Sequence, residues 1–208
     1  MSHSNPRSRR LQTVGKLRNL VVFIRFADHV DRHFPSQSDY DVIFNSDGGH
    51  PVLAPTGSVR DVFKQSSFGE LDITSVVTPW ITLPRTEKYY ANGNSGLTAK
   101  THMALLYALN QVVNTTGINF KDFDLNNDGE IDAITFVHSG YAAEWGVRDC
   151  NGVDVNDRIW SHKWGLPSSF YSRGVRVQRY SINPGLWGTC GSDVGRIGVI
   201  AHEIGHFL

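Results

Sequence analysis

The sequence has no excess of charge of either sign and no long apolar run. Its 208 residues include 20 basic and 20 acidic side chains, which gives a formal net charge of +0. Nucleic acids and anionic membranes are bound through basic patches, and the basic residues here form one short cluster, Arg7 to Arg10. The most apolar run, Leu20 to Phe26, is far shorter than the roughly 20 residues that span a bilayer. These absences argue against nucleic-acid partners and against a membrane-spanning helix.

Cysteine is also scarce, and no apolar leader follows the basic N-terminus. Cys150 and Cys190 could form one disulfide or remain thiols, and one bridge cannot be the scaffold of a chain this long. Met1 to Arg10 leads into no apolar segment with a small-residue cleavage site, so no signal peptide is visible. The chain is therefore either cytosolic or lacks its natural N-terminus. A hydrophobic fraction of 40% predicts one globular domain, 20–208, after a polar segment, 1–19.

Hydrophobic periodicity predicts that strands and helices alternate within this domain. Strands are expected at 20–26, 71–79, 131–137 and 175–182. Helices are expected at 58–64, 97–113 and 195–208. The polar stretch 28–49 predicts a long loop. Interleaved strands and helices indicate an α/β or α+β domain, with a mixed sheet and the long helix 97–113 lying across it.

The C-terminal segment carries the strongest chemical signal, an H-E-x-x-H motif at 202–206. Apolar residues three or four apart predict that this segment is helical. His202 and His206 then project from one face about one turn apart, so both imidazoles can bind one zinc ion. Glu203 is placed to take a proton from a water activated by that ion and to pass it to the leaving amine. The alternative is that two ordinary histidines match the motif by accident.

A second motif, at 124–135, has the pattern of a calcium-binding loop. Side chains that carry oxygen alternate along it, and Gly129 provides the sharp turn. The oxygen-bearing residues are Asp124, Asn126, Asp128, Glu130 and Asp132. The last position, usually a bidentate Glu, is Thr135, so a residue such as Asp122 would have to complete the site. The alternative is an Asp/Asn/Gly turn that binds no metal.

Three more polar residues, His138, Glu144 and His162, lie among aromatic and glycine residues between the two motifs. Each could line a cleft. Taken one at a time, however, such residues are more often satisfied core or loop groups.

Taken together, the segments of the chain resemble the M6 peptidases, the immune inhibitor A type of secreted bacterial metalloproteases. The resemblance covers 20–208. The matching segments, in chain order, are LVVFIRFADH, GSVRDVFKQSSFGELDITSVV, DLNNDGEIDAITFVHSGYAAEWG, IWSHKWG and IGVIAHEIGHFL. A generic zinc protease need not carry the calcium-like loop and the VHSG segment before its zinc helix, so the combination is fairly specific.

The resemblance implies a secreted, zinc-dependent endopeptidase that acts on proteins or peptides and is stabilised by calcium. It implies the upper subdomain of a zincin-like fold, with a mixed twisted sheet, a long backing helix and a C-terminal active-site helix. Carried onto this sequence, His202 and His206 match two zinc ligands, and Glu203 matches the catalytic base.

The family's motif continues beyond the end of this chain, with a Gly and then a third zinc ligand. The chain ends at Leu208, and two imidazoles are fewer than the three protein ligands of catalytic zinc sites. The sequence therefore predicts a C-terminally incomplete catalytic domain, unless a residue such as His162 is recruited as the third ligand. The alternative function is a catalytically inactive, calcium-stabilised binding module that retains the protease fold.

Overall fold

The structure is a computed structural model that describes residues 14–208. Most of the predicted polar segment, 1–19, lies outside the described residues. The first strand begins at Gly15 rather than Leu20, so the last residues of that segment belong to the sheet.

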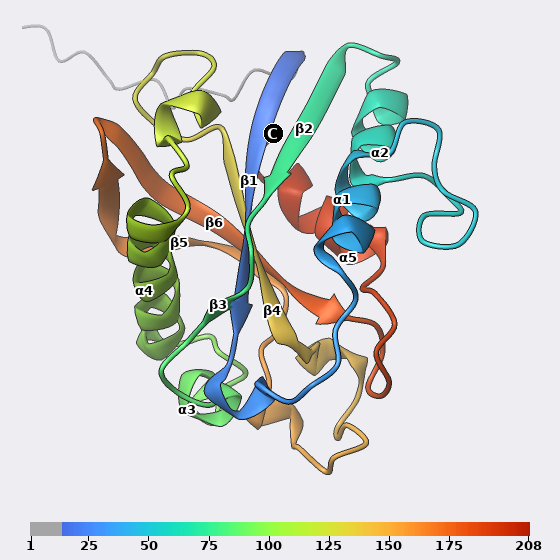
Figure 1. The fold of residues 1–208 in the computed structure, drawn as a ribbon, viewed down its shortest axis with the longest axis vertical. Helices are drawn as coiled ribbons and strands as arrows, with labels where there is room; N and C mark the ends of the chain where they lie inside the picture. The colour runs from blue at the N-terminus through green and yellow to red at the C-terminus, as the bar shows by residue number, and fades with distance from the viewer. Residues whose placement is uncertain (1–13) are drawn as a thin grey trace, which may run out of the picture.

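A mixed, six-stranded sheet forms the centre of the fold, as the sequence predicts (Figure 1). Its strands are β1 (Gly15–Arg25), β2 (Leu71–Val77), β3 (Ile81–Thr82), β4 (Ala133–Tyr141), β5 (His162–Ser172) and β6 (Val175–Leu186). The order across the sheet is β2-β1-β4-β6-β5, and the short β3 also pairs with β1. All pairs are parallel except β5 with β6, so the edge strand β5 runs against its neighbour. Every residue of β4 is buried, because helices cover both faces of the sheet.

One face of the sheet is covered by α4 (Ala99–Thr115), the long helix that the sequence predicts across the sheet (Figure 1). Its buried side chains join apolar residues of β1, β4 and β6 in one core cluster. The buried apolar residues of α4 are Ala104, Leu105, Ala108, Leu109 and Val112. Burial of each large side chain contributes about 1.5–3 kcal/mol, which holds the helix against the sheet.

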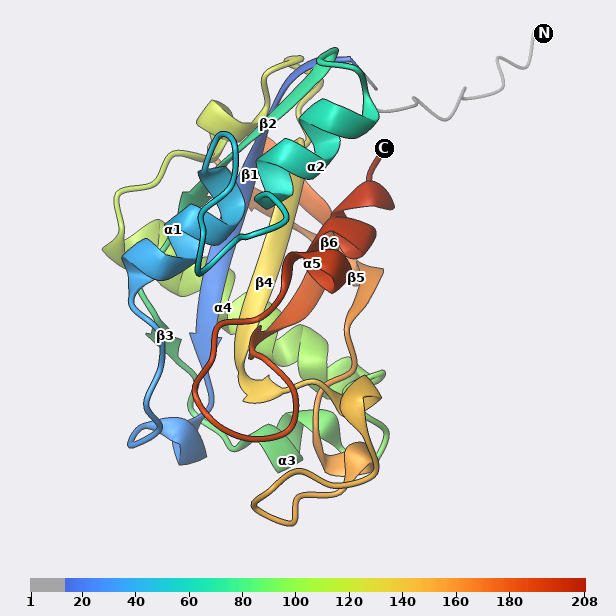
Figure 2. The same ribbon diagram turned by 90° about the vertical axis from the view of Figure 1, so that its right-hand side faces the viewer.

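The opposite face is covered by α1 (Gln37–Asn45), α2 (Val59–Ser66) and α5 (Ile197–Gly205). Figure 2 shows α5 alongside β6 and next to α2. Apolar residues of these helices form a second core cluster with the other face of β1, β2 and β4. The sheet thus separates α4 from the helix that carries the H-E-x-x-H motif.

Several elements, among them the two-residue strand β3, are absent from the sequence prediction. The polar stretch 28–49 is not only a loop, because it contains α1, which begins with a capping box between Ser36 and Asp39. The short helix α3 (Glu87–Ala91) and the strand β5 are also new. Gly165 and Pro167 interrupt β5, and its register shifts after Gly165, so no regular alternation marks it as a strand.

A disulfide joins Cys150 and Cys190, whose Cα atoms are 5.3 Å apart. This resolves the choice left open by the sequence in favour of a bridge, which ties the 143–157 region to the loop before α5. Among the described helices, none is long and apolar enough to cross a membrane.

Candidate active site

The helix α5 forms where the motif predicts it and is held by its apolar side. Ile200 and Ile204 are buried in the second core cluster, and Phe207, just beyond the helix, is also buried. Because these residues face the sheet, the residues between them face outward. His202 and His206 are exposed accordingly. The packing of α5 therefore fixes which face presents the two imidazoles.

The two histidines converge. Nε2 of His202 lies 3.2 Å from Nε2 of His206, and the ring planes are nearly perpendicular. One ligand atom from each of His202, Glu203 and His206 lies within 4.8 Å of the others. Within residues 14–208, this is the one group of three or more His, Cys, Asp or Glu side chains that comes together in this way. The two imidazoles lie next to each other, as expected for side chains four residues apart on a helix.

Glu203 differs from the two histidines in its surroundings, since it is buried. Burial raises the pKa of its carboxyl group, and the neighbouring charge of Glu144 acts in the same direction. The two histidines and a backbone hydrogen bond from Lys163 act in the opposite direction. Burial thus puts the carboxylate, next to the imidazole pair, in a setting that favours proton uptake.

Glu144, a secondary candidate from the sequence, lies near this site and not in it. Its carboxylate accepts hydrogen bonds from the backbone N–H of Ser161, at 3.1 Å, and from the Ser161 hydroxyl. These bonds tie the short helix 143–145 to the residue that precedes β5. Ser161 and the Lys163 backbone were not predicted as site residues, although both lie in the IWSHKWG segment that carries part of the resemblance.

His162 cannot be the third ligand in this structure, which corrects one of the two alternatives above. Its Nδ1 donates to the carbonyl oxygen of Trp160 at 2.8 Å, and its Nε2 accepts from the hydroxyl of Tyr180 at 3.1 Å. Its ring shares a cavity with residues of α4, across the sheet from α5. Successive side chains of a strand point to opposite faces of the sheet, so the side chains of His162 and its neighbour Lys163 lie on different faces.

His138 is buried in a separate group with His29 and Glu87. Nε2 of His29 lies 3.5 Å from Oε2 of Glu87, and Nδ1 of His138 lies 3.9 Å from Oε1 of the same carboxyl. These three residues, hereafter the buried group, come from the short helix 27–29, α3 and β4. All three are at most 6% exposed, so they line no open cleft.

The predicted calcium loop forms a tight turn that is closed by its own hydrogen bonds. The Asp124 carboxylate accepts from the backbone N–H groups of Asp128 and Gly129, at 2.9 and 3.0 Å. Glu130 instead pairs with Arg176 and Arg179, at 2.6 and 3.2 Å. The arrangement is that of an Asp/Asn/Gly turn, and calcium binding stays a prediction.

Two further members of the loop differ from each other in burial. Asn126 is exposed and accepts a hydrogen bond from the backbone N–H of Asp128 at 3.0 Å. Asp132 is 1% exposed, and burial raises the pKa of its carboxyl to about 6. Its Oδ1 has no hydrogen-bond partner among the described residues.

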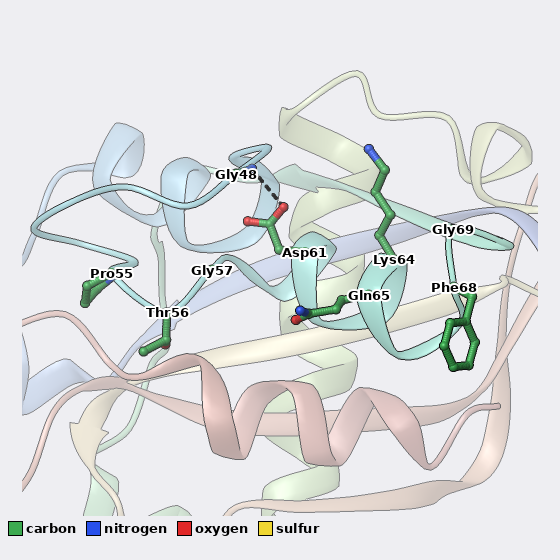
Figure 3. A pocket seen from close by; sticks show the side chains of 9 residues that line it. All are labelled: Gly48, Pro55, Thr56, Gly57, Asp61, Lys64, Gln65, Phe68 and Gly69. Atoms are coloured by element: carbon green, nitrogen blue, oxygen red, sulfur yellow. Dashed lines mark hydrogen bonds between the residues drawn. The ribbon is translucent and has the colours of Figure 1, made fainter.

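A wide, open hollow of about 530 Å³ lies beside α2, and its lining includes neither of the two histidines (Figure 3). The carboxylate of Asp61 is directed to its wall and accepts hydrogen bonds from the backbone N–H groups of Gly48 and Gly49, each at 2.9 Å. These bonds help to hold the pKa of Asp61 below its usual range. The carboxylate is therefore engaged in fixing the loop that precedes α2, and the hollow contains none of the predicted site residues.

Comparison with known proteins agrees with the geometry. The family model described as "Immune inhibitor A peptidase M6, catalytic domain" matches residues 15–208. No curated protein sequence matches the chain at a significant level. The match covers nearly every described residue and includes the convergent His/Glu/His site. The chain belongs to the M6 peptidase family of metallopeptidases.

Proposed function

We propose that this chain is the catalytic domain of a zinc-dependent endopeptidase in which Glu203 acts as the general base. The observation that carries the proposal is the convergence of His202 and His206, whose Nε2 atoms are 3.2 Å apart, beside the buried carboxylate of Glu203. Two imidazoles this close on an exposed face fit two ligands of one metal ion. A hydrogen bond between them would contribute little to stability, because water competes for both rings at the surface.

The donor set fits zinc, which is bound by imidazole nitrogens in most of its catalytic sites. His202 and His206 would hold the ion, and the family resemblance implies a third protein ligand besides them. When bound, zinc supplies Lewis-acid chemistry, lowering the pKa of water and polarising a substrate carbonyl.

The chain's own contribution to proton transfer is Glu203. Its carboxylate would accept a proton from the attacking water and deliver it to the nitrogen of the leaving amine. A raised pKa suits both steps, because the group must take up the proton and then release it.

A comparison of the two edges of the sheet supports extended peptides as the substrate class. At the β2 edge, the Asn45 side chain bonds both backbone groups of Ser75, at 2.7 and 2.9 Å, and Gln37 donates to the carbonyl oxygen of Val77 at 2.9 Å. The β5 edge has β6 as its one strand neighbour within the described residues. An edge of this kind can take an extended peptide as an additional strand. We propose that internal peptide segments bind there, next to Glu203.

We also propose an extracellular location for the protein. The disulfide between Cys150 and Cys190 supports it, because such bridges persist in oxidising compartments and are rare in the cytosol. Fractionation of the native host is the test. Recovery of the protein only from the cytosol would contradict this part of the proposal.

The test of the function is zinc content and casein hydrolysis measured on the same samples of the full-length gene product, with His202→Ala as the comparison. The parent should retain about one zinc per chain after dialysis and should cleave casein. The variant should lose both. Zinc-free parent protein that neither takes up zinc nor cleaves casein would contradict the proposal and favour a binding module that keeps the protease fold.

A further inference from the structure

A small cavity lies on the α4 side of β5, behind the strand segment that packs against α5. Its volume is about 170 Å³. The first turn of α4 and the residues before it form one wall, and the start of β5 with Tyr180 of β6 forms the other. Its rim is exposed at Leu97 and Trp164, which are 46% and 59% exposed. The cavity therefore opens to solvent beside the free edge of the sheet.

The lining of this cavity carries no fixed charge. Burial lowers the pKa of both His102 and His162, and raises the pKa of Tyr180, so all three are neutral near pH 7. His162 is further fixed as the Nδ1–H tautomer, because the carbonyl oxygen of Trp160 can only accept a hydrogen bond and the Tyr180 hydroxyl supplies the proton at Nε2. A charged group would lose its hydration here without a counter-charge.

The size and walls of the cavity suit one uncharged side chain. A cavity of about 150 Å³ lined by apolar groups accommodates benzene, and this one is slightly larger. Its walls include the rings of Trp164, Tyr180 and His102, which offer edge-to-face contacts to an aromatic group. A drug-sized ligand or a nucleotide needs at least about 300 Å³.

The strand β5 connects this cavity to the candidate active site. Lys163 lies between His162 and Trp164, and its backbone is near enough to the carboxylate of Glu203 to act on the pKa of that group. Its side chain lies on the α5 side, with Nζ 6.0 Å from the centre of the Phe207 ring. The two residues on either side of Lys163 line the cavity on the other face. The cavity and the catalytic carboxylate are thus on opposite faces of the same three residues.

We propose that this cavity is a specificity subsite that takes an apolar, preferably aromatic, side chain of a peptide bound along the free edge of β5. Side chains of an extended peptide alternate between the two faces of a sheet. A residue adjacent to one that faces α5 and Glu203 therefore directs its side chain to the α4 face, where the cavity opens. This inference rests on the proposed function, because it requires a peptide substrate at that edge.

The test uses a set of peptides that carry Phe, Ala or Glu at one position at a time. For the parent protein, kcat/KM at one position should favour Phe over Ala by about tenfold or more, and Glu should be the poorest. Ala99→Phe places a ring in the cavity and should bring the Phe-to-Ala ratio close to one. Met103→Phe adds the same ring at a position on α4 that is 55% exposed and outside the cavity, and should keep the parent ratio.

Failure of the subsite can be distinguished from failure of the proposed function. Cleavage of the peptides with no position that prefers Phe, or an unchanged ratio in Ala99→Phe, would overturn the subsite and leave the peptidase intact. If no peptide is cleaved, casein hydrolysis decides the proposed function, and calorimetric binding of the Phe and Ala peptides to Glu203→Gln protein decides the subsite alone. Tighter binding of the Phe peptide that Ala99→Phe removes supports it, and equal binding overturns it.

Discussion

Among the described residues, two His/Glu/His groups have the same composition but differ in exposure and in the direction of their side chains. His202, Glu203 and His206 lie within one helix, and their two histidines are exposed with converging Nε2 atoms. The buried group gathers its members from three elements far apart in the sequence, and all of them are shielded from solvent. Composition alone therefore does not define a metal site. Accessible lone pairs directed at one point are also needed.

In the buried group, one nitrogen of each imidazole is hydrogen-bonded within the fold. Nδ1 of His29 is 3.0 Å from the Ser139 hydroxyl, and that hydroxyl oxygen accepts from the backbone N–H of Phe26. Nδ1 of His138 accepts from the backbone N–H of Gly140 at 3.1 Å. The bonds to Ser139 tie the residue after β1 and the short helix 27–29 to β4, which is a structural role.

The protonation states in the buried group are the reverse of those in an ordinary ion pair between His and Glu. Burial raises the pKa of Glu87 to about 8 and lowers the pKa of His29 and His138 to about 4 and about 3. The group is consequently neutral near pH 7, with a protonated carboxyl and two neutral imidazoles. The group in α5 instead keeps its histidines in contact with solvent.

The largest effect that tests this comparison is expected at Glu203. Replacing it by Gln removes the proton acceptor and retains both imidazoles, so hydrolysis should fall by about 10²–10⁴-fold while zinc content is unchanged. Rate assays and elemental analysis of the same preparation measure both. Activity within a few fold of the parent would remove Glu203 from its assigned role.

The second largest effect is expected on stability, because the space around the two groups differs. A Cβ added at Gly140 would lie 2.0 Å from Oε1 of Glu87, whereas one added at Gly198 of α5 would meet nothing within 4 Å. Gly140→Ala should therefore lower the free energy of unfolding by about 1–3 kcal/mol. Gly198→Ala should raise it by up to about 1 kcal/mol, because alanine favours the helix. Urea denaturation of both variants measures the difference, and equal signs would contradict the close packing of the buried group.

How well the sequence predicts these features depends on how far apart the residues involved lie along the chain. The α5 site was predictable because its residues are four apart on one helix. The buried group was not, because His29 and His138 meet only through the pairing of β1 with β4. Helix α1 could have been found, since Ser36 and Asp39 form a capping box that the polar composition of the stretch obscured.

The pH dependence of stability should come from the buried group. An unfolded Glu loses its proton near pH 4.5, whereas Glu87 in the fold keeps its proton up to about pH 8. Stability from this residue is thus complete below pH 4.5 and is lost as the pH rises to 8. His29 and His138 have the opposite effect on the pH dependence of stability. Because their pKa values are lowered in the fold, they reduce stability as the pH falls below 6.5.

Between pH 6.5 and 8, Glu87 therefore acts without the opposing histidine effect. Among its charged neighbours, Arg32 lowers its pKa, and Asp28 and Asp149 raise it. The parent should lose about 1–2 kcal/mol of stability across this interval. Glu87→Gln mimics the protonated acid and should flatten the profile. A matching decline in the variant would show that the carboxyl does not carry the dependence.

The smallest expected effect is on zinc content when the buried group is altered. His29→Asn removes an imidazole as completely as His202→Ala does, and it should lower stability because the bond to Ser139 is lost. Zinc per chain should nevertheless remain at the parent value, because the buried group is shielded from solvent. A fall in zinc in His29→Asn protein that is still folded by circular dichroism would mean that both groups bind metal, and the contrast between them would fail.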